Sequence, residues 1–150
     1  MKLSTRSRYG TRLMLDMAQH YDHGPLHLTS IAQRQGISVK YLEQIIIPLK
    51  KAQLVKGIRG PKGGHILGKP PEAITVGEIV ALMEDGMSIV DCSEHPEVCQ
   101  RSETCVTRSV WREAADAMFG TLRAITLADL VKIHAAGAAG RGYLVETGKD

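Results

Sequence analysis

The chain has 150 residues, of which 43% are hydrophobic and 23% are charged, so it is long enough to bury one ordinary hydrophobic core. Its first 21 residues carry Arg6, Arg8, Arg12 and Asp16 and no long apolar run, which argues against a secretory signal or a spanning helix there. We therefore expect a cytoplasmic protein with no membrane partner. An odd number of cysteines, three, argues against a disulfide framework and for a metal or redox role.

The net charge of +3 conceals a strong asymmetry along the chain. Residues 1–69 hold twelve Lys and Arg against three acids, a balance of +9, whereas residues 70–150 hold seven against thirteen, a balance of −6. Scattered Lys and Arg usually belong to an ordinary solvated surface, but here they fall on the elements that would dock against a polyanion. The asymmetry favours a nucleic-acid partner for the first half of the chain.

Apolar spacing predicts the first two helices of the basic half. The helix over residues 4–21 has an apolar face at four-residue intervals, formed by Tyr9, Leu13, Met17 and Tyr21. The second helix is predicted to begin near Leu28, with Thr29 or Ser30 as its cap, and to stop at Gly36, which suits a left-handed C-terminal turn. The short turn that separates it from the next helix is typical of a helix-turn-helix.

The third helix is predicted to begin at a capping Ser38. Its buried stripe consists of Val39, Leu42, Ile45, Ile46 and Leu49. Near its N-terminal end, where a recognition helix meets base edges, four side chains are expected to face outward: Lys40, Tyr41, Glu43 and Gln44. Pro48 removes one helical hydrogen bond at a cost of about 3 kcal/mol, so we expect a kink there that spares the reading end.

Two short apolar runs around a Gly/Pro turn, residues 54–58 and 65–67, predict a β-hairpin. A hairpin after a helix-turn-helix is a wing, and Arg59 and Lys62 at its tip are placed to enter a minor groove or to bind phosphate. The glycine-rich turn is not a phosphate-binding loop, because it lacks the required glycine patterns and no helix follows directly. We therefore predict a DNA-binding domain over residues 1–69.

Residues 70–134 are predicted to hold a connecting helix, a cysteine loop and a dimerisation helix. Thr75 and Glu78 have the spacing of a capping box, which opens the connecting helix. A long helix from about Cys105 has an apolar stripe formed by Trp111, Ala114, Ala115, Met118, Leu122 and Ile125. Because the winged domain already has its own core, we favour a dimer seam over a core role for this stripe.

The acidic half is predicted to end in a short helix and a tail. Thr126 and Asp129 stand at the start of a helix that runs to about His134. Residues 135–150 begin with an Ala/Gly-rich run, and we expect them to form a flexible tail.

Three cysteines, Cys92, Cys99 and Cys105, lie in one loop at the spacing Cys-x6-Cys-x5-Cys. Thiolates are the usual ligands of 2Fe–2S and 4Fe–4S clusters, whereas structural zinc sites usually contain a closer cysteine pair. The loop therefore favours an iron–sulfur cluster over a metal-free thiol switch, and over zinc or inert cysteines. Its acidic side chains would raise the thiol pKa values, so bare thiols are expected to be poorly activated. His95 is more readily explained as a surface histidine than as a ligand.

Four short motifs carry a resemblance to a known family. They are Arg-Tyr-Gly at 8–10, Gln-Gly-Ile-Ser at 35–38, Tyr-Leu-Glu-Gln at 41–44 and Arg-Gly-Pro-x-Gly-Gly at 59–64. With them the chain resembles, over about residues 1–134, the bacterial Rrf-type regulators, which include cluster, nitric-oxide, iron and cysteine-metabolism regulators. The resemblance implies a homodimeric winged-helix transcription regulator, expected to act as a repressor on a pseudo-palindromic operator in double-stranded DNA.

The resemblance also implies roles for single residues. It places Lys40, Glu43 and Gln44 at the DNA-reading end, Arg59 on the wing, and the three cysteines at an iron–sulfur cluster. Cluster-assembly regulators of the family use a histidine three residues after the third cysteine as a fourth ligand, and this position is Arg108 here. Nitric-oxide sensors use an acidic residue near the partner's N-terminus, where this chain has Arg8. The fourth cluster position is therefore expected to be weakly held.

No residue spacing in the chain indicates catalysis. Two other classes remain as alternatives: a metal-free regulator that responds to a thiol, small molecule or partner protein, and, more remotely, an iron–sulfur electron carrier. The predicted fold class is mainly α with a small β-hairpin, a winged helix-turn-helix domain followed by a long dimerisation helix.

Overall fold

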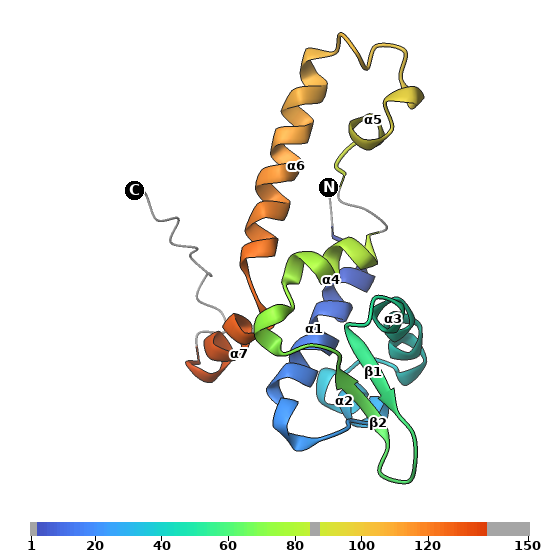
Figure 1. Ribbon diagram of the computed structural model, residues 1–150, viewed down its shortest axis with the longest axis vertical. Helices are drawn as coiled ribbons and strands as arrows, with labels where there is room; N and C mark the ends of the chain where they lie inside the picture. Colours follow the sequence, from blue (N-terminus) through green and yellow to red (C-terminus); the bar gives the residue numbers. More distant parts are fainter. Residues whose placement is uncertain (1–2, 85–87, 138–150) are drawn as a thin grey trace.

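A computed structural model describes residues 3–84 and 88–137 of the chain. In Figure 1 one long helix projects from a body of packed helices, and the hairpin loop lies at the opposite end of the molecule. Within the described ranges the helices and strands are α1 (Thr5–Gln19), α2 (Leu28–Gln35), α3 (Val39–Lys51), β1 (Val55–Ile58), β2 (Gly64–Leu67), α4 (Val76–Met83), α5 (Asp91–Glu94), α6 (Val106–Ala124) and α7 (Leu127–Ala135). This arrangement confirms the predicted mainly α fold with a hairpin.

The helix-turn-helix of α2 and α3 forms where the sequence predicted it. Gly36 ends α2 with a φ of 63°, the left-handed conformation that glycine adopts without strain. The Ser38 hydroxyl then caps α3 by accepting a hydrogen bond from the Tyr41 N–H. The predicted start of α2 near Leu28 is confirmed, but the prediction that Thr29 or Ser30 caps it is wrong, because the N-cap residue is His27 and its side chain makes no capping hydrogen bond.

The wing is an antiparallel pair of strands in which Val55 lies opposite Leu67 and Ile58 opposite Gly64. Its second strand is also tied to the α1–α2 connection, because Leu26 and His65 exchange both backbone hydrogen bonds, at 2.9 and 2.8 Å. Gly64 has a φ of 152°, and a Cβ there would lie 2.7 Å from the Leu26 carbonyl oxygen. Only glycine allows this close approach of the wing to the body.

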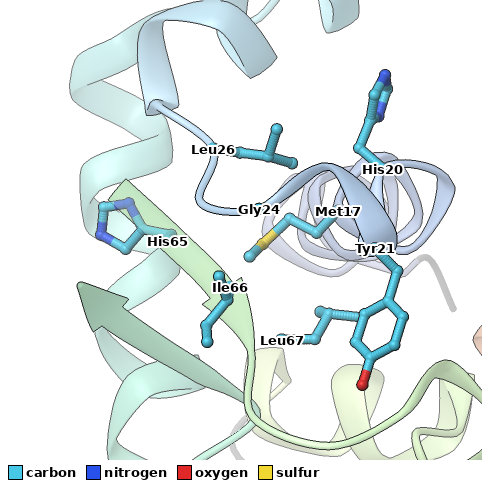
Figure 2. A pocket seen from close by; sticks show the side chains of 8 residues that line it. All are labelled: Met17, His20, Tyr21, Gly24, Leu26, His65, Ile66 and Leu67. Atoms are coloured by element: carbon cyan, nitrogen blue, oxygen red, sulfur yellow. The ribbon is translucent and has the colours of Figure 1, made fainter. Parts of the chain in front are cut away.

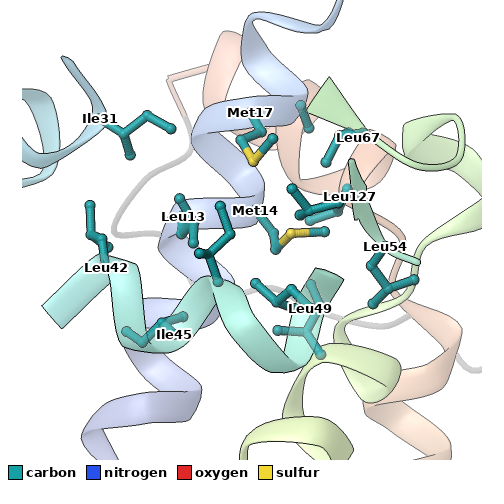
Figure 3. Close-up of a cluster of buried hydrophobic side chains, with 14 of the residues drawn as sticks. Leu13, Met14, Met17, Ile31, Leu42, Ile45, Leu49, Leu54, Leu67 and Leu127 are labelled. Carbon is teal, nitrogen blue, oxygen red and sulfur yellow. The ribbon is translucent and has the colours of Figure 1, made fainter. Parts of the chain in front are cut away.

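The hydrophobic core lies between α1 and α3, and Figure 3 shows their side chains packed face to face. It also includes residues from α4 and α7, so the buried cluster extends past residue 69. Its fully buried large side chains are Leu13, Met14, Met17, Ile31, Leu42, Ile45, Leu49, Ile74, Ile79, Met83, Leu127 and Val55. Tyr21, predicted on the buried face of the first helix, is exposed instead, because α1 ends at Gln19.

Helix α6 joins the hydrophobic body through its C-terminal half, whereas its N-terminal half contacts the cysteine loop. Its C-terminal half contributes Phe119, which joins Val76, Val80 and Ile125 in a second buried cluster. There α6 crosses α4 closely, since a Cβ on Gly77 would lie 2.6 Å from the Arg123 side chain. The N-terminal half has an exposed apolar surface, formed by Val106 (79% exposed), Val110 (52%) and Trp111 (45%).

Both predicted starts of the later helices are confirmed. Thr75 with Glu78, and Thr126 with Asp129, each form a complete capping box, in which side chain and backbone bond reciprocally. No helix in the part of the chain that the structure describes is long and apolar enough to cross a membrane. Most of the tail predicted over 135–150 falls outside the described residues.

Candidate nucleic-acid interface and cysteine loop

Helix α3 presents its predicted reading residues unequally. Lys40, Glu43 and Gln44 are exposed on the first two turns. Tyr41 is half-buried, and its ring meets the ring of Tyr9 edge-on, with centroids 5.8 Å apart and an interplanar angle of 86°. The tyrosine therefore supports the reading helix against α1 and leaves its three neighbours facing solvent.

Arg12 holds the turn between α2 and α3. Its Nε donates a hydrogen bond to Gln35 Oε1 at 3.1 Å, and a second guanidinium N–H donates to the Gln35 backbone carbonyl. The guanidinium carbon also lies 5.5 Å from the centre of the Tyr9 ring. A cation that binds the last carbonyls of a helix complements its C-terminal dipole, so Arg12 stabilises the end of α2 next to the turn.

Asp16 is a buried carboxylate, only 1% exposed, between α1 and α2. Its oxygens accept hydrogen bonds from Arg34 Nε at 3.0 Å and from Gln35 Nε2 at 2.9 Å. Burial alone would raise the pKa of Asp16, but the hydrogen bonds and the charge of Arg34 outweigh it and hold this pKa below its usual value. The ionised group therefore locks the first two helices together. Sequence analysis missed it, because its partners lie 18 and 19 residues away.

The wing residues Arg59 and Lys62 are both exposed on the loop between β1 and β2. A hollow beside the wing, shown in Figure 2, is lined by Met17, His20, Tyr21, Gly24, Leu26, His65, Ile66 and Leu67. Its volume of about 10 Å³ corresponds to a single water, so it is no site for a ligand. Burial first, and then the charge of Lys50, lower the pKa of His65, which keeps this histidine neutral where the wing meets the body.

The cysteine loop contains two short helical turns, α5 and η3 (Pro96–Val98), that sequence analysis did not predict. Cys92 lies on α5, Cys99 ends η3 and Cys105 immediately precedes α6; all three thiols are free and half-buried. In the described ranges, no group of three His, Cys, Asp or Glu side chains is arranged to hold a metal ion. Three thiols fit an iron–sulfur cluster by their chemistry, but they would have to converge to bind one.

Other polar residues of the loop can be placed as well. His95 is exposed, and its Nδ1 lies 3.2 Å from a Glu97 carboxylate oxygen, as suits a surface histidine. Arg108 is turned back into the loop and donates to backbone carbonyls. The expectation of raised thiol pKa values is wrong for Cys105: a hydrogen bond with the Thr107 hydroxyl, at 3.2 Å, and hydrogen bonds with backbone N–H groups lower the pKa of this thiol.

A further contact joins the end of α4, which leads into the loop, to the start of α1. Glu84 accepts hydrogen bonds from the Ser4 N–H, at 2.7 Å, and from the hydroxyl of the buried Ser7. Burial opposes ionisation, but these hydrogen bonds prevail and lower the pKa of Glu84. Helix α1 is thereby bound to the loop side of the molecule at one end and, through Tyr9, to the reading helix.

A helix-turn-helix with exposed polar side chains at its reading end, followed by a hairpin wing with exposed basic side chains, defines a winged-helix DNA-binding regulator. The family model described as "Rrf2: Iron-dependent Transcriptional regulator" matches residues 3–133. The chain belongs to the Rrf2 family, and it is a transcription regulator rather than an enzyme.

Individual relatives and solved structures agree with this family. The chain is 48% identical over 132 residues to "Protein rrf2" of Nitratidesulfovibrio vulgaris, covering 88% of both chains. It is 40% identical over 131 residues to the transcriptional regulator IscR of Serratia proteamaculans, covering 87% of this chain and 79% of that one. The structure of T. potens IscR matches with a TM-score of 0.76 at 41% identity, covering 95% of each chain. CymR, the global cysteine regulator of B. subtilis, matches with a TM-score of 0.73 at 39% identity, covering 88% of this chain and 97% of that one.

Proposed function

We propose that the protein is a homodimeric repressor that binds a pseudo-palindromic operator and senses iron–sulfur status, redox state or nitric oxide through a cluster held by Cys92, Cys99 and Cys105. The observation that carries this proposal is the position of the three thiols, on one loop at the end of a helix that projects from the reading body. Similarity to IscR and the iron-dependent family description support it. Because the proposed operator is part of chromosomal DNA, we expect the protein to act in the cytoplasm.

For DNA binding, we assign base reading to the exposed N-terminal end of α3. There Glu43 and Gln44 offer a carboxylate and an amide, which pair with base edges, and Lys40 offers a cation. Arg59 and Lys62 on the wing would bind phosphate or a narrow minor groove, and so would contribute affinity more than sequence preference.

For dimerisation, we assign the exposed apolar surface of α6 to a second copy of this chain. Val106, Val110 and Trp111 leave an apolar strip in water on the projecting half of the helix, and covering it is favourable at about 25 cal/mol per Å². A two-fold pair of reading helices matches two half-sites about one turn of duplex, roughly 34 Å, apart.

For cluster binding, the three cysteines would supply three thiolate ligands. The cluster would provide iron that oxygen and nitric oxide can attack. The fourth position would be taken by a loop carboxylate such as Glu94 or Glu103, by His95, or by a small molecule, because Arg108 has no lone pair to offer. A weakly held iron would make the site sensitive to its signal.

The test is iron and sulfide analysis, with an absorption spectrum, of protein purified without oxygen. We expect bound iron in the wild type, its loss in each of Cys92→Ala, Cys99→Ala and Cys105→Ala, and an operator affinity that changes with cluster loss. Single changes at Glu94, His95 and Glu103 should keep most of the iron. Full iron content and unchanged DNA binding in all three cysteine variants would refute the sensor assignment.

The second candidate is a metal-free regulator that responds to thiol oxidation or to a small molecule of sulfur metabolism. Two observations favour it: the three free thiols are not gathered into a metal-binding group within the described ranges, and the structure is similar to a cysteine regulator. Protein isolated without oxygen would then contain no iron, yet its operator affinity would change on reversible thiol oxidation.

A further inference from the structure

Arg108 lies on the first turn of α6, three residues after Cys105, and its guanidinium donates hydrogen bonds to backbone carbonyls of the cysteine loop. Its Nε donates to the backbone carbonyl of Cys92 at 2.7 Å. Its Nη1 donates to the carbonyl of Ser102 at 3.2 Å, and its Nη2 makes a longer hydrogen bond to the carbonyl of Ser93, at 3.5 Å. The three acceptors come from two separate parts of the loop, α5 and the turn that follows Cys99.

The chemistry of the guanidinium explains why an arginine can do this. It is planar and always charged, and its N–H donors have fixed directions, so three carbonyls bound to it are fixed relative to one another. Hydrogen bonds from a charged donor are also stronger than those between neutral groups. A lysine ammonium has the same charge but no planar fork, and would not hold the two parts of the loop in one arrangement.

We propose that Arg108 is a positioning residue that folds the cysteine loop onto the start of α6 before any metal is bound. The three thiols must still converge to bind a metal, but a loop that Arg108 has already folded loses less conformational entropy in that step than a flexible segment between Cys92 and Cys105 would. Arg108 thus holds the Cys92 backbone beside the helix turn that Cys105 begins. The value of this arrangement for metal binding rests on the proposed function; the folding of the loop by Arg108 does not.

The first test measures hydrogen exchange in the metal-free, reduced full-length protein. The informative amides are those of Ser93, His95 and Ser102, which donate to carbonyls within the loop. We expect their exchange to be at least tenfold faster in both Arg108→Ala and Arg108→Lys, a change equivalent to about 1.4 kcal/mol. Arg112→Ala, which removes an exposed arginine one turn further along α6, is the matched control and should exchange as the wild type does.

Exchange in the core helices serves as the internal reference, because it should be equal in all four proteins. Loop exchange that is unchanged in Arg108→Ala, or that is restored to the wild-type rate in Arg108→Lys, would overturn the proposal. Unchanged exchange in Arg108→Ala would show that the arginine does not stabilise the loop. Wild-type exchange in Arg108→Lys would show that a positive charge at this position is enough to stabilise it, without the planar guanidinium.

The second test follows iron uptake during anaerobic reconstitution with iron and sulfide. We expect Arg108→Lys to take up iron at least threefold more slowly than wild type, with the Arg112→Ala control unchanged. Equal uptake rates would contradict preorganisation of the site. Wild-type protein that binds no iron would refute the proposed cluster instead, and the exchange experiment would still decide whether Arg108 folds the loop.

Discussion

Removing Arg34 should leave Asp16 as a buried carboxylate without its main partner. Breaking one side of a buried ion pair commonly costs about 3–5 kcal/mol, because the remaining charge stays desolvated. Here Arg34 is 36% exposed and Gln35 keeps its hydrogen bond to Asp16, so we place the cost of Arg34→Ala lower, at about 2 kcal/mol. The measurement is urea unfolding of wild type and variant at pH 7 and at one fixed protein concentration, followed by circular dichroism.

The lowered pKa of Asp16 also predicts how the destabilisation caused by Arg34→Ala changes with pH. Since the pKa of Asp16 is lowered by folding, its contribution is fully present above its unfolded pKa and is lost as pH falls through its folded pKa. The stability difference between wild type and Arg34→Ala should therefore be largest at neutral pH and should narrow as the pH falls below the ordinary aspartate pKa of about 3.9. A difference that is absent at pH 7, or constant as pH falls, would refute the reasoning.

The exposed ion pair between Lys69 and Glu78 offers a control for the same experiment. Their nitrogen and oxygen lie 3.3 Å apart, and both side chains are exposed to solvent. Such pairs contribute about 0–1 kcal/mol, so Lys69→Ala should change the free energy of unfolding much less than Arg34→Ala does.

Three further predictions concern the close helix crossing, the DNA contacts and the dimer. Gly77→Ala should destabilise the protein by about 1–3 kcal/mol, whereas Gly120→Ala, with open space around its Cβ, should be neutral or stabilising in the same urea titration. Arg59→Ala should weaken binding to matched and scrambled duplexes alike, while Glu43→Ala should alter the preference between them; the reverse pattern in binding titrations would contradict the assignment. Trp111→Asp should yield monomers at micromolar concentration by sedimentation, unless the apolar face of α6 lies outside the interface.

Local rules were sufficient to predict most of the reading body. Three features of this body depend on only a few neighbouring residues: the side-chain cap of α3, the left-handed Gly36 and the Gly/Pro turn of the wing. They can therefore be predicted from short stretches of sequence. The capping boxes that begin at Thr75 and Thr126 are local in the same sense. The start of α2 was placed correctly near Leu28, but its capping residue was misassigned, because the N-cap residue His27 makes no side-chain capping hydrogen bond and so leaves no local signal.

The features that sequence analysis missed depend on tertiary approach. In the sequence, Asp16 looks like an ordinary surface acid on an amphipathic helix. Only the packing of α2 against α1 shows that Arg34 and Gln35 bind it. Phe119 lay outside the predicted stripe on α6, yet it is buried because α4 crosses the helix there. For the candidate site, composition identified the three cysteines, but neither the two turns of the loop nor the part played by Arg108 has a pattern of its own.

The one-sided packing of α6 has an evolutionary consequence. Within the described residues, neither buried cluster includes a side chain from the loop or from the projecting half of this helix. Substitutions there alter no packing in the body, so they carry little penalty for the stability of the DNA reader. An exchange at position 108, such as histidine for arginine, would change the folding of the cysteine loop and the chemistry beside it without disturbing the core of the DNA reader. Substitutions in one exposed loop can in this way change the signal to which the regulator responds, while the DNA-binding body stays the same.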